Sequence, residues 1–170
     1  MKLFHVSDVH FGAEDPAAIA WFAACVAAER PDAVIMTGDL TMRARRDEFA
    51  RGAAWLEALG VPVTVEIGNH DIPYYSDPFG RLVRPYRRYL AVERMIERSL
   101  ALPGVTVVPL RTVARLQWRI DQSKGQVSRR SLAQAAAAIR AAPAGDLILV
   151  AAHHPLAGRE EDEEIDTVGG

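Results

Sequence analysis

The feature of this sequence that most constrains its fold is a set of short apolar runs separated by stretches with helical periodicity. The runs are rich in valine and isoleucine and lie at residues 3–7, 33–37, 63–67, 105–109 and 147–151. Apolar runs of this length are typical of buried strands, and helices between successive strands are typical of parallel sheets. The sequence therefore predicts an α/β fold.

Residues that begin and end helices lie between these runs. Asp15 is placed to cap a helix whose first residue is Pro16, and this helix should end near residue 30. A second helix is predicted over residues 46–59. It should end there because Gly60 and a following proline stop it. The remaining predicted elements are a helix that ends near residue 100, a strand at 115–120, a turn at 124–125 and a helix at 128–142.

The composition is that of a soluble globular chain: 170 residues, of which 49% are hydrophobic and 25% charged. We expect one domain over residues 1–158, followed by an acidic flexible tail over residues 159–170. Outside the tail the positive and negative charges nearly cancel. This balance makes a nucleic-acid partner unlikely on electrostatic grounds.

The N-terminal segment and the cysteine content bear on the cellular compartment. The first apolar run reaches Asp8 after a few residues, which is too short for a signal peptide or a membrane-spanning helix. The single cysteine, Cys25, cannot form an internal disulfide, and its small neighbours predict a buried helix position. We expect a cytoplasmic protein with no membrane partner.

Polar residues follow directly after four of the predicted strands. They are Asp8 and His10 after the first, Gly38 and Asp39 after the second, Gly68, Asn69, His70 and Asp71 after the third, and His153 and His154 after the last. In open α/β sheets ligands bind at the carboxyl ends of the strands, so these residues are expected to converge. Carboxylate, imidazole and amide donors suit Mn, Fe, Zn or Co.

The spacing within these groups also suits a metal site. Asp8 and His10 are two residues apart, so in an extended segment their side chains would point the same way and share one ion. A carboxylate such as Asp39 can bridge two ions about 3.5–4 Å apart. Gly38 and Gly68 would let the backbone turn sharply beside the ions.

Each group taken alone has an ordinary structural explanation. Asp8 and His10 can be a polar strand end, Gly38 and Asp39 a common turn, and the side chain of Asn69 can stabilise a turn. A small-molecule site at the strand ends without any metal is a further alternative. The occurrence of all four groups in this order, after successive strands, favours a metal site.

The order of these groups resembles that of the calcineurin-like metallophosphoesterases. The family blocks Asp-x-His, Gly-Asp, Gly-Asn-His-Asp or -Glu, and a later His stand here as Asp8-Val9-His10, Gly38-Asp39, Gly68-Asn69-His70-Asp71 and His153-His154-Pro155. Within the family the sequence is most similar to the bacterial cyclic-nucleotide phosphodiesterase-like branch, on the segments at residues 7–12, 37–41 and 153–156. The resemblance covers nearly the whole chain. It implies an α/β metallophosphoesterase sandwich with αββα layers.

The resemblance also implies roles for the individual residues. It implies two divalent ions, Mn, Fe, Zn or Co, held by Asp8, His10, Asp39, Asn69 and His153, with Asp39 shared between them. His70 would be the catalytic acid beside the phosphate, while His154 and Asp71 would support the ligands or act as further ligands. The implied reaction is hydrolysis of a small phosphoester or nucleotide, with phosphodiesters favoured, by a metal-bound hydroxide.

One family block has no counterpart in the sequence. The final Gly-His-x-His block is absent, because no histidine follows His154 before Gly170. We therefore expect a C-terminally truncated domain. The alternative function is that of a catalytically impaired fragment or regulatory protein that binds a metal or nucleotide.

The segment at residues 74–89 mixes arginine with aromatic residues. It suits either a nucleotide clamp or a solvent-exposed basic face, and the same two interpretations apply to the arginines at 43, 45 and 46. The wider segment at residues 72–100 is also a plausible contact region for a homodimer. Trp21, Trp55 and Trp118 are predicted to lie in the core or an interface.

Overall fold

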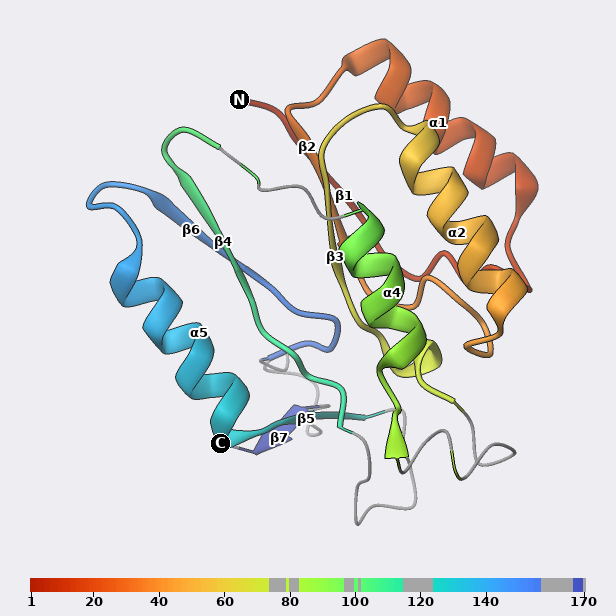
Figure 1. The fold of residues 1–170 in the computed structure, drawn as a ribbon. Coiled ribbons are helices and arrows are strands. Elements are labelled where there is room, and N and C mark those ends of the chain that lie inside the picture. The colour runs from red at the N-terminus through yellow and green to blue at the C-terminus, as the bar shows by residue number, and fades with distance from the viewer. Residues whose placement is uncertain are drawn as a thin grey trace, which may run out of the picture. The chain divides into compact units, whose positions relative to one another are not determined.

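The computed structural model describes residues 1–73, 79, 83–96, 100, 102–114, 124–156 and 167–169. The chain divides into two compact units, residues 1–100 and residues 101–170. Each unit combines helices with parallel strands, so the predicted α/β class is confirmed. Figure 1 shows the elements of both units.

The sheet of the first unit has three parallel strands. These are β1 (Leu3–Val6), β2 (Ala33–Thr37) and β3 (Val63–Glu66), in the spatial order β1-β2-β3. The central strand β2 is buried along its whole length, which explains why all of its residues before the final Thr37 are apolar. Val6 pairs with Met36, and Thr37 pairs with Glu66, so the three strands end at nearly the same level. The loops that follow them therefore start from one edge of the sheet.

Two helices lie on one side of this sheet (Figure 1), α1 (Pro16–Glu29) and α2 (Arg46–Ala58). Asp15 caps α1 as predicted, because its Oδ1 accepts a hydrogen bond from the backbone N of Ala17 at 2.8 Å. Phe22 of α1 packs on Phe4 of β1, with ring centroids 6.2 Å apart. Burial of this apolar layer holds the helices on the sheet.

A third helix, α4 (Arg87–Ile96), packs against β3 and α2. Its Tyr89 is fully buried and donates a hydrogen bond from its hydroxyl to the backbone oxygen of Val65 at 2.6 Å. Between β3 and α4 the chain forms the short 3-10 helix η1 (Asn69–Asp71). The helix predicted to end near residue 100 is thus present, and its described part ends at residue 96.

The second unit contains a parallel pair of strands, β4 (Val105–Pro109) and β6 (Leu147–Ala151), and the helix α5 (Arg129–Ala141). Val108, Leu110 and Ala135 form its buried cluster. Ser128 caps α5 by accepting a hydrogen bond from the backbone N of Ser131 at 3.0 Å. A second parallel pair joins β5 (Gly125–Val127) to β7 (Thr167–Gly169).

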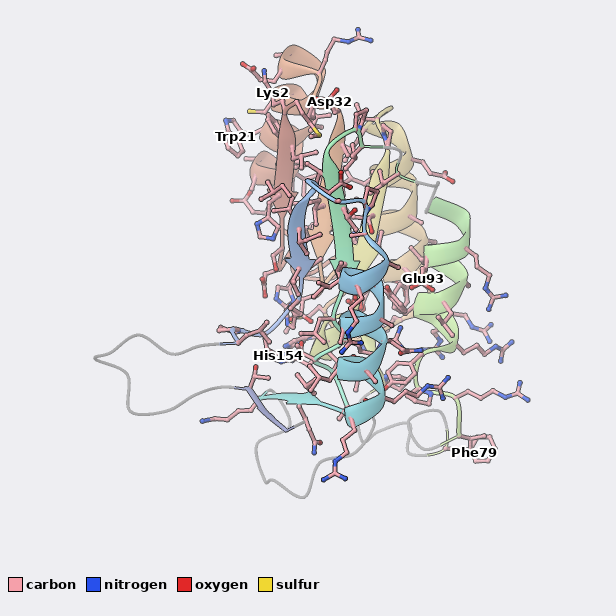
Figure 2. All side chains as sticks on the ribbon, turned by 90° about the vertical axis from the view of Figure 1, so that its left-hand side faces the viewer. Lys2, Trp21, Asp32, Phe79, Glu93 and His154 are labelled. Carbon is pink, nitrogen blue, oxygen red and sulfur yellow. The ribbon has the colours of Figure 1, made fainter. Side chains whose placement is uncertain are left out.

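Two sequence expectations differ from the structure. Gly125 begins strand β5 and does not form the predicted turn, because it pairs with Thr167 of β7. A Cβ atom at Gly125 would overlap the side chains of Thr167 and His154, so the close approach requires glycine. Trp21 is 67% exposed and points away from the fold (Figure 2), so it does not lie in the core, and its alternative place in an interface stays a prediction. Apart from Glu29, all residues of α1 are apolar, so its sequence does not distinguish the face toward solvent from the face toward the sheet.

Other expectations fall partly or wholly outside the described residues. These are the strand at 115–120, Trp118 and most of the segment at 159–170. Within that segment, residues 167–169 form β7 and so belong to a sheet. Cys25 is half-buried on α1. None of the helices in the described part of the chain has the length and hydropathy needed to cross a membrane.

Replacing Asp15 with alanine should lower the free energy of unfolding by about 1 kcal/mol, since the first turn of α1 loses its capping acceptor. Urea denaturation followed by circular dichroism measures this loss. Asp15→Asn keeps a side-chain oxygen and should retain most of the stability. An equal loss in both variants would show that the cap does not stabilise α1.

Candidate metal centre

The loops that follow β1 and β2 run side by side beyond the ends of the strands. The backbone N of Asp8 donates to the oxygen of Gly38 at 3.1 Å, and that of His10 donates to the oxygen of Asp39 at 2.9 Å. An isolated bridge between Phe11 and the second loop continues the pairing. These contacts place the predicted ligands of the two loops next to each other.

The backbone at three predicted ligands is left-handed. The φ angles are 57° at Asp8, 53° at His10 and 54° at Asp39. Our expectation that Asp8 and His10 lie in an extended segment was therefore wrong, because β1 already ends at Val6. Asp and His are among the residues that tolerate this region best, although it costs roughly 1 kcal/mol per residue. Three of the five non-glycine residues with left-handed backbone among the described residues are predicted metal ligands, and the other two are Arg30 and Ala44.

The turn after β3 reaches Asp39 only because residue 68 is a glycine. A Cβ atom on Gly68 would overlap both the side chain and the backbone nitrogen of Asp39. The φ of Gly68 is −101°, so the requirement is for space and not for a special backbone conformation. This approach allows the backbone N of His70 to donate to Oδ1 of Asp39 at 2.8 Å.

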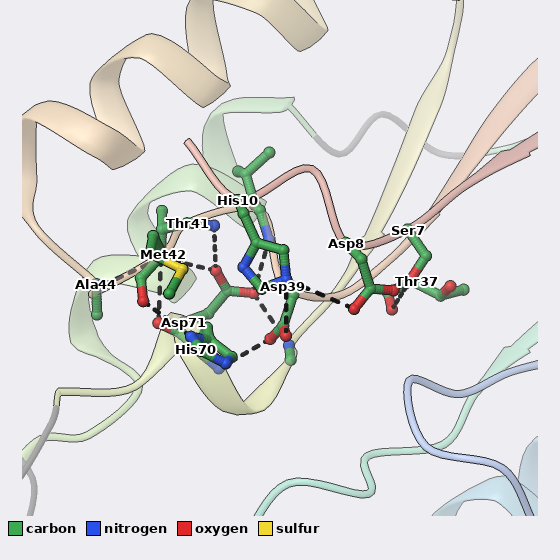
Figure 3. A network of polar contacts seen from close by, with 12 residues as sticks. Ser7, Asp8, His10, Thr37, Asp39, Thr41, Met42, Ala44, His70 and Asp71 are labelled. Carbon is green, nitrogen blue, oxygen red and sulfur yellow. Dashed lines mark hydrogen bonds and ion pairs between the residues drawn. The ribbon is translucent and has the colours of Figure 1, made fainter. Parts of the chain in front are cut away.

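The side chains of three residues then converge on one point (Figure 3). Donor atoms of His10, Asp39 and His70 all lie within 4.8 Å of one another. Nε2 of His10 lies 3.6 Å from Oδ2 of Asp39 and 3.7 Å from Oδ1 of Asp8. Asp39 is buried, whereas the side chain of Asp8 is 56% exposed. The centre is thus closed on one side and accessible on the other.

This donor set fits a divalent cation. The two distances from His10 to the carboxylates are too long for hydrogen bonds. They are close to the separation, about 3–3.6 Å, of two donors that bind one ion at about 2.0–2.2 Å each. Nδ1 of His10 is buried and has no hydrogen-bond partner among the described residues.

A hydrogen bond to the backbone of Met42 selects the tautomer of His70. Its Nδ1 lies 2.9 Å from the backbone oxygen of Met42, which can only accept, so Nδ1 carries the hydrogen. In the neutral ring the lone pair is then on Nε2. The ring meets that of His10 edge-on, with centroids 4.7 Å apart. The geometry is compatible with the predicted acid and also with a further metal ligand.

Asp71 joins the loop after β2 to the turn after β3. Its carboxylate accepts hydrogen bonds from the backbone nitrogens of Leu40 at 3.2 Å, Thr41 at 2.8 Å and Gly68 at 3.0 Å, and from the Thr41 hydroxyl at 2.9 Å. The pKa of Asp71 is raised to about 6, mainly by burial and also by the nearby Asp39 carboxylate, while the hydrogen bonds from Gly68 and Thr41 act in the opposite direction. Since both oxygens are engaged, these contacts favour a supporting role over that of a ligand.

The remaining predicted site residues are Asn69, His153 and His154. Asn69 is the first residue of η1 and is half-buried. His153 and His154 follow β6 in the second unit, with ring centroids 4.6 Å apart. His154 is buried, and its Nδ1 lies 2.8 Å from the hydroxyl oxygen of Thr112, which favours a structural role. Participation of His153 in the metal centre stays a prediction.

Two supporting residues were missed by the sequence analysis. The hydroxyl of Ser7 donates to the Asp8 carboxylate and so orients it. Glu48 is buried, and its Oε2 accepts from the backbone nitrogens of Arg43 at 2.8 Å and Arg45 at 3.1 Å. A glutamate at the third position of a predicted helix was the available signal for this contact. Ser7 has no comparable signal.

The Asp71→Asn variant should be less stable than the wild type by about 2–4 kcal/mol, because an amide NH₂ would face buried N–H donors that now have an acceptor. Asp47→Asn, an exposed change on α2, should alter stability by less than about 0.5 kcal/mol. Urea unfolding of the two variants measures the difference. Equal stability would contradict the role of Asp71 in joining the turns.

Two comparisons with known proteins bear on this arrangement. A search of curated proteins finds no match. The family model of the calcineurin-like phosphoesterases matches residues 1–168, which is nearly the whole chain. The chain therefore belongs to the calcineurin-like phosphoesterase family, whose members are metal-dependent phosphoester hydrolases.

Proposed function

We propose that this protein hydrolyses phosphodiesters at a centre of two divalent metal ions. The observation that carries the proposal is the convergence of His10, Asp39 and His70 at the ends of parallel strands. A buried carboxylate between two imidazoles suits Mn, Fe, Zn or Co better than it suits a purely structural role. Family membership supports the hydrolytic reaction. The ground for proposing diesters is the resemblance of residues 7–12, 37–41 and 153–156 to the cyclic-nucleotide phosphodiesterase-like branch.

Asp8, His10 and Asp39 would hold the first ion. Asp39, Asn69 and His153 would hold the second, so Asp39 would bridge the pair. Asp39 is suited to this position because it is buried and its Oδ1 is already oriented by the backbone N of His70. When bound, the ions would lower the pKa of a water nucleophile and offset the charge on the phosphoryl oxygens.

The protein residues around the ions would orient the substrate and handle the proton. Ser7 holds the Asp8 carboxylate, and Met42 fixes the ring of His70 through its backbone oxygen. A protonated His70 would donate from Nε2 to the leaving oxygen, for which an imidazole near the reacting group is required. The proton stays on Nδ1 throughout, since the Met42 oxygen cannot give one back.

The first experiment is Mn-dependent hydrolysis of bis(p-nitrophenyl) phosphate by the wild type, Asp39→Asn and Asp47→Asn. Asp39→Asn keeps the shape of the side chain and an oxygen for the His70 nitrogen, but it removes the negative charge. We expect it to lower kcat/KM at least about 100-fold, because the bridging charge is lost. Asp47→Asn should match the wild type.

The outcomes of this experiment separate the alternatives. Hydrolysis that requires Mn and is lost only in Asp39→Asn supports the proposal. A folded protein that binds Mn through Asp39 without turnover would instead be a metal binder. Folded protein that binds no divalent metal would contradict a metal centre altogether. Parallel assays with p-nitrophenyl phosphate test the preference for diesters over monoesters.

The role of His70 can be tested separately by His70→Gln. If His70 is the acid, metal content should be unchanged while kcat falls about 10²–10⁴-fold, since general acid catalysis contributes that much. A substrate with a better leaving group should be affected less. Loss of bound metal, measured by elemental analysis of the desalted protein, would instead show that His70 is a ligand.

A further inference from the structure

The first unit contains a cavity that the metal centre does not account for. It has a volume of about 530 Å³ and is lined by Arg46, Pro73, Phe79, Val83, Arg84, Pro85, Arg87, Arg88 and Ala91. We call it the arginine pocket. Four guanidinium groups and no carboxylate line it among the described residues. Phe79 and Val83, which are 76% and 52% exposed, supply an apolar side.

Three of the four arginines lie on helices α2 and α4, and Arg84 lies three residues before α4. Arg46 is the first residue of α2, and Arg87 is the first residue of α4. The positive ends of both helix dipoles therefore lie at the pocket and add to the charge of the side chains. Arg45, the residue before α2, provides no side-chain cap, as expected for a side chain without an acceptor. Like charges gathered around one hollow repel one another, and an anion there would relieve this repulsion.

The pocket borders the loop that supports the metal centre. Nη1 of Arg88 donates to the backbone oxygen of Ala44 at 2.6 Å. The backbone N of Ala44 in turn donates to the hydroxyl oxygen of Thr41 at 3.2 Å, and Thr41 binds Asp71. Pro73, which lines the pocket, follows Asp71 by two residues. One loop thus separates the arginines from the residues around His70.

An ordinary solvated basic face would look different. Arg94 shows that arrangement, because it lies on α4 outside the pocket, and its Nε donates to the oxygen of its own helix at Leu90. The pocket arginines instead surround a hollow together with an exposed aromatic ring. Figure 2 shows Phe79 beyond the N-terminal end of α4. Guanidinium groups bind phosphate or carboxylate oxygens in pairs, and an aromatic ring accepts a planar or apolar group.

We propose that the arginine pocket binds a second anionic group of the substrate, a phosphate or carboxylate attached to a planar or apolar moiety. This assignment rests on the proposed phosphodiesterase function. It deepens that function by naming the substrate class: phosphodiesters that carry a further negative group beyond the scissile one. Arg84 and Arg87 bind the anion, Phe79 contacts the attached group, and Arg88 positions the loop.

Binding to the full chain in EDTA tests the pocket without any dependence on activity. The probes are 1-naphthyl phosphate, inorganic pyrophosphate and 1-naphthol, measured by calorimetry. We expect the two anions to bind and the neutral naphthol not to bind. The double variant Arg84→Gln/Arg87→Gln should weaken anion binding at least tenfold, because each charge-assisted hydrogen bond contributes on the order of tenfold. Phe79→Ala should weaken naphthyl phosphate more than pyrophosphate.

Arg94→Gln is the matched control, since it removes the same charge from the same helix outside the pocket. Circular dichroism establishes that all variants are folded. An equal loss of binding in Arg94→Gln would overturn the proposal, because it would show only a general charge effect. Absence of anion binding to the folded wild type would overturn it as well.

Kinetics test the assignment of this group to the substrate. The p-nitrophenyl phosphodiester of thymidine is compared with the same ester carrying a second phosphate on the sugar. We expect the second phosphate to lower KM about tenfold in the wild type and in Arg94→Gln, but not in the double variant. Anion binding to the pocket together with equal KM values would overturn the substrate assignment. Failure of the proposed function is distinct, since neither ester would then be hydrolysed while binding in EDTA persisted.

Discussion

The centre depends on the close approach of two turns, at Gly68 and Asp39. Parallel strands that end at the same level bring the loops to one edge, but this alone leaves the turns several ångströms apart. The missing side chain of Gly68 removes that gap and lets η1 pack directly on Asp39. The bond from His70 to Asp39 and the four bonds to Asp71 all follow from this contact.

Most of the fold could be predicted from local sequence patterns. The apolar runs located five of the seven strands in the described residues to within one residue, because these runs are mostly apolar and are bounded by polar residues. The three-residue strands β5 and β7 lie outside these runs and were not predicted. Asp15 marked a helix start through its side-chain cap, and Gly60 marked a helix end through its left-handed backbone. Trp21 could not be placed, since a helix whose side chains are nearly all apolar offers no contrast between its inner and outer face.

The proximity of the candidate residues could be predicted, but their geometry could not. The order of the blocks selected Asp8, His10 and Asp39, which the structure brings together, yet the left-handed backbone at these residues has no signature in the sequence. The position of His70 beside His10 likewise depends on how η1 packs. Contacts between residues that are distant in the chain decide these features, and periodicity reports only on local structure.

The left-handed backbone at the predicted metal ligands restricts how this candidate centre can change. A side chain branched at Cβ enters that region only with severe strain, so valine, isoleucine and threonine are disfavoured at Asp8, His10 and Asp39 whatever their chemistry. Asparagine, aspartate, histidine and glycine are the metal-compatible or small residues that tolerate it best. The variants from which selection or design could derive a different metal preference are therefore few, and they are limited by backbone geometry before coordination chemistry is considered.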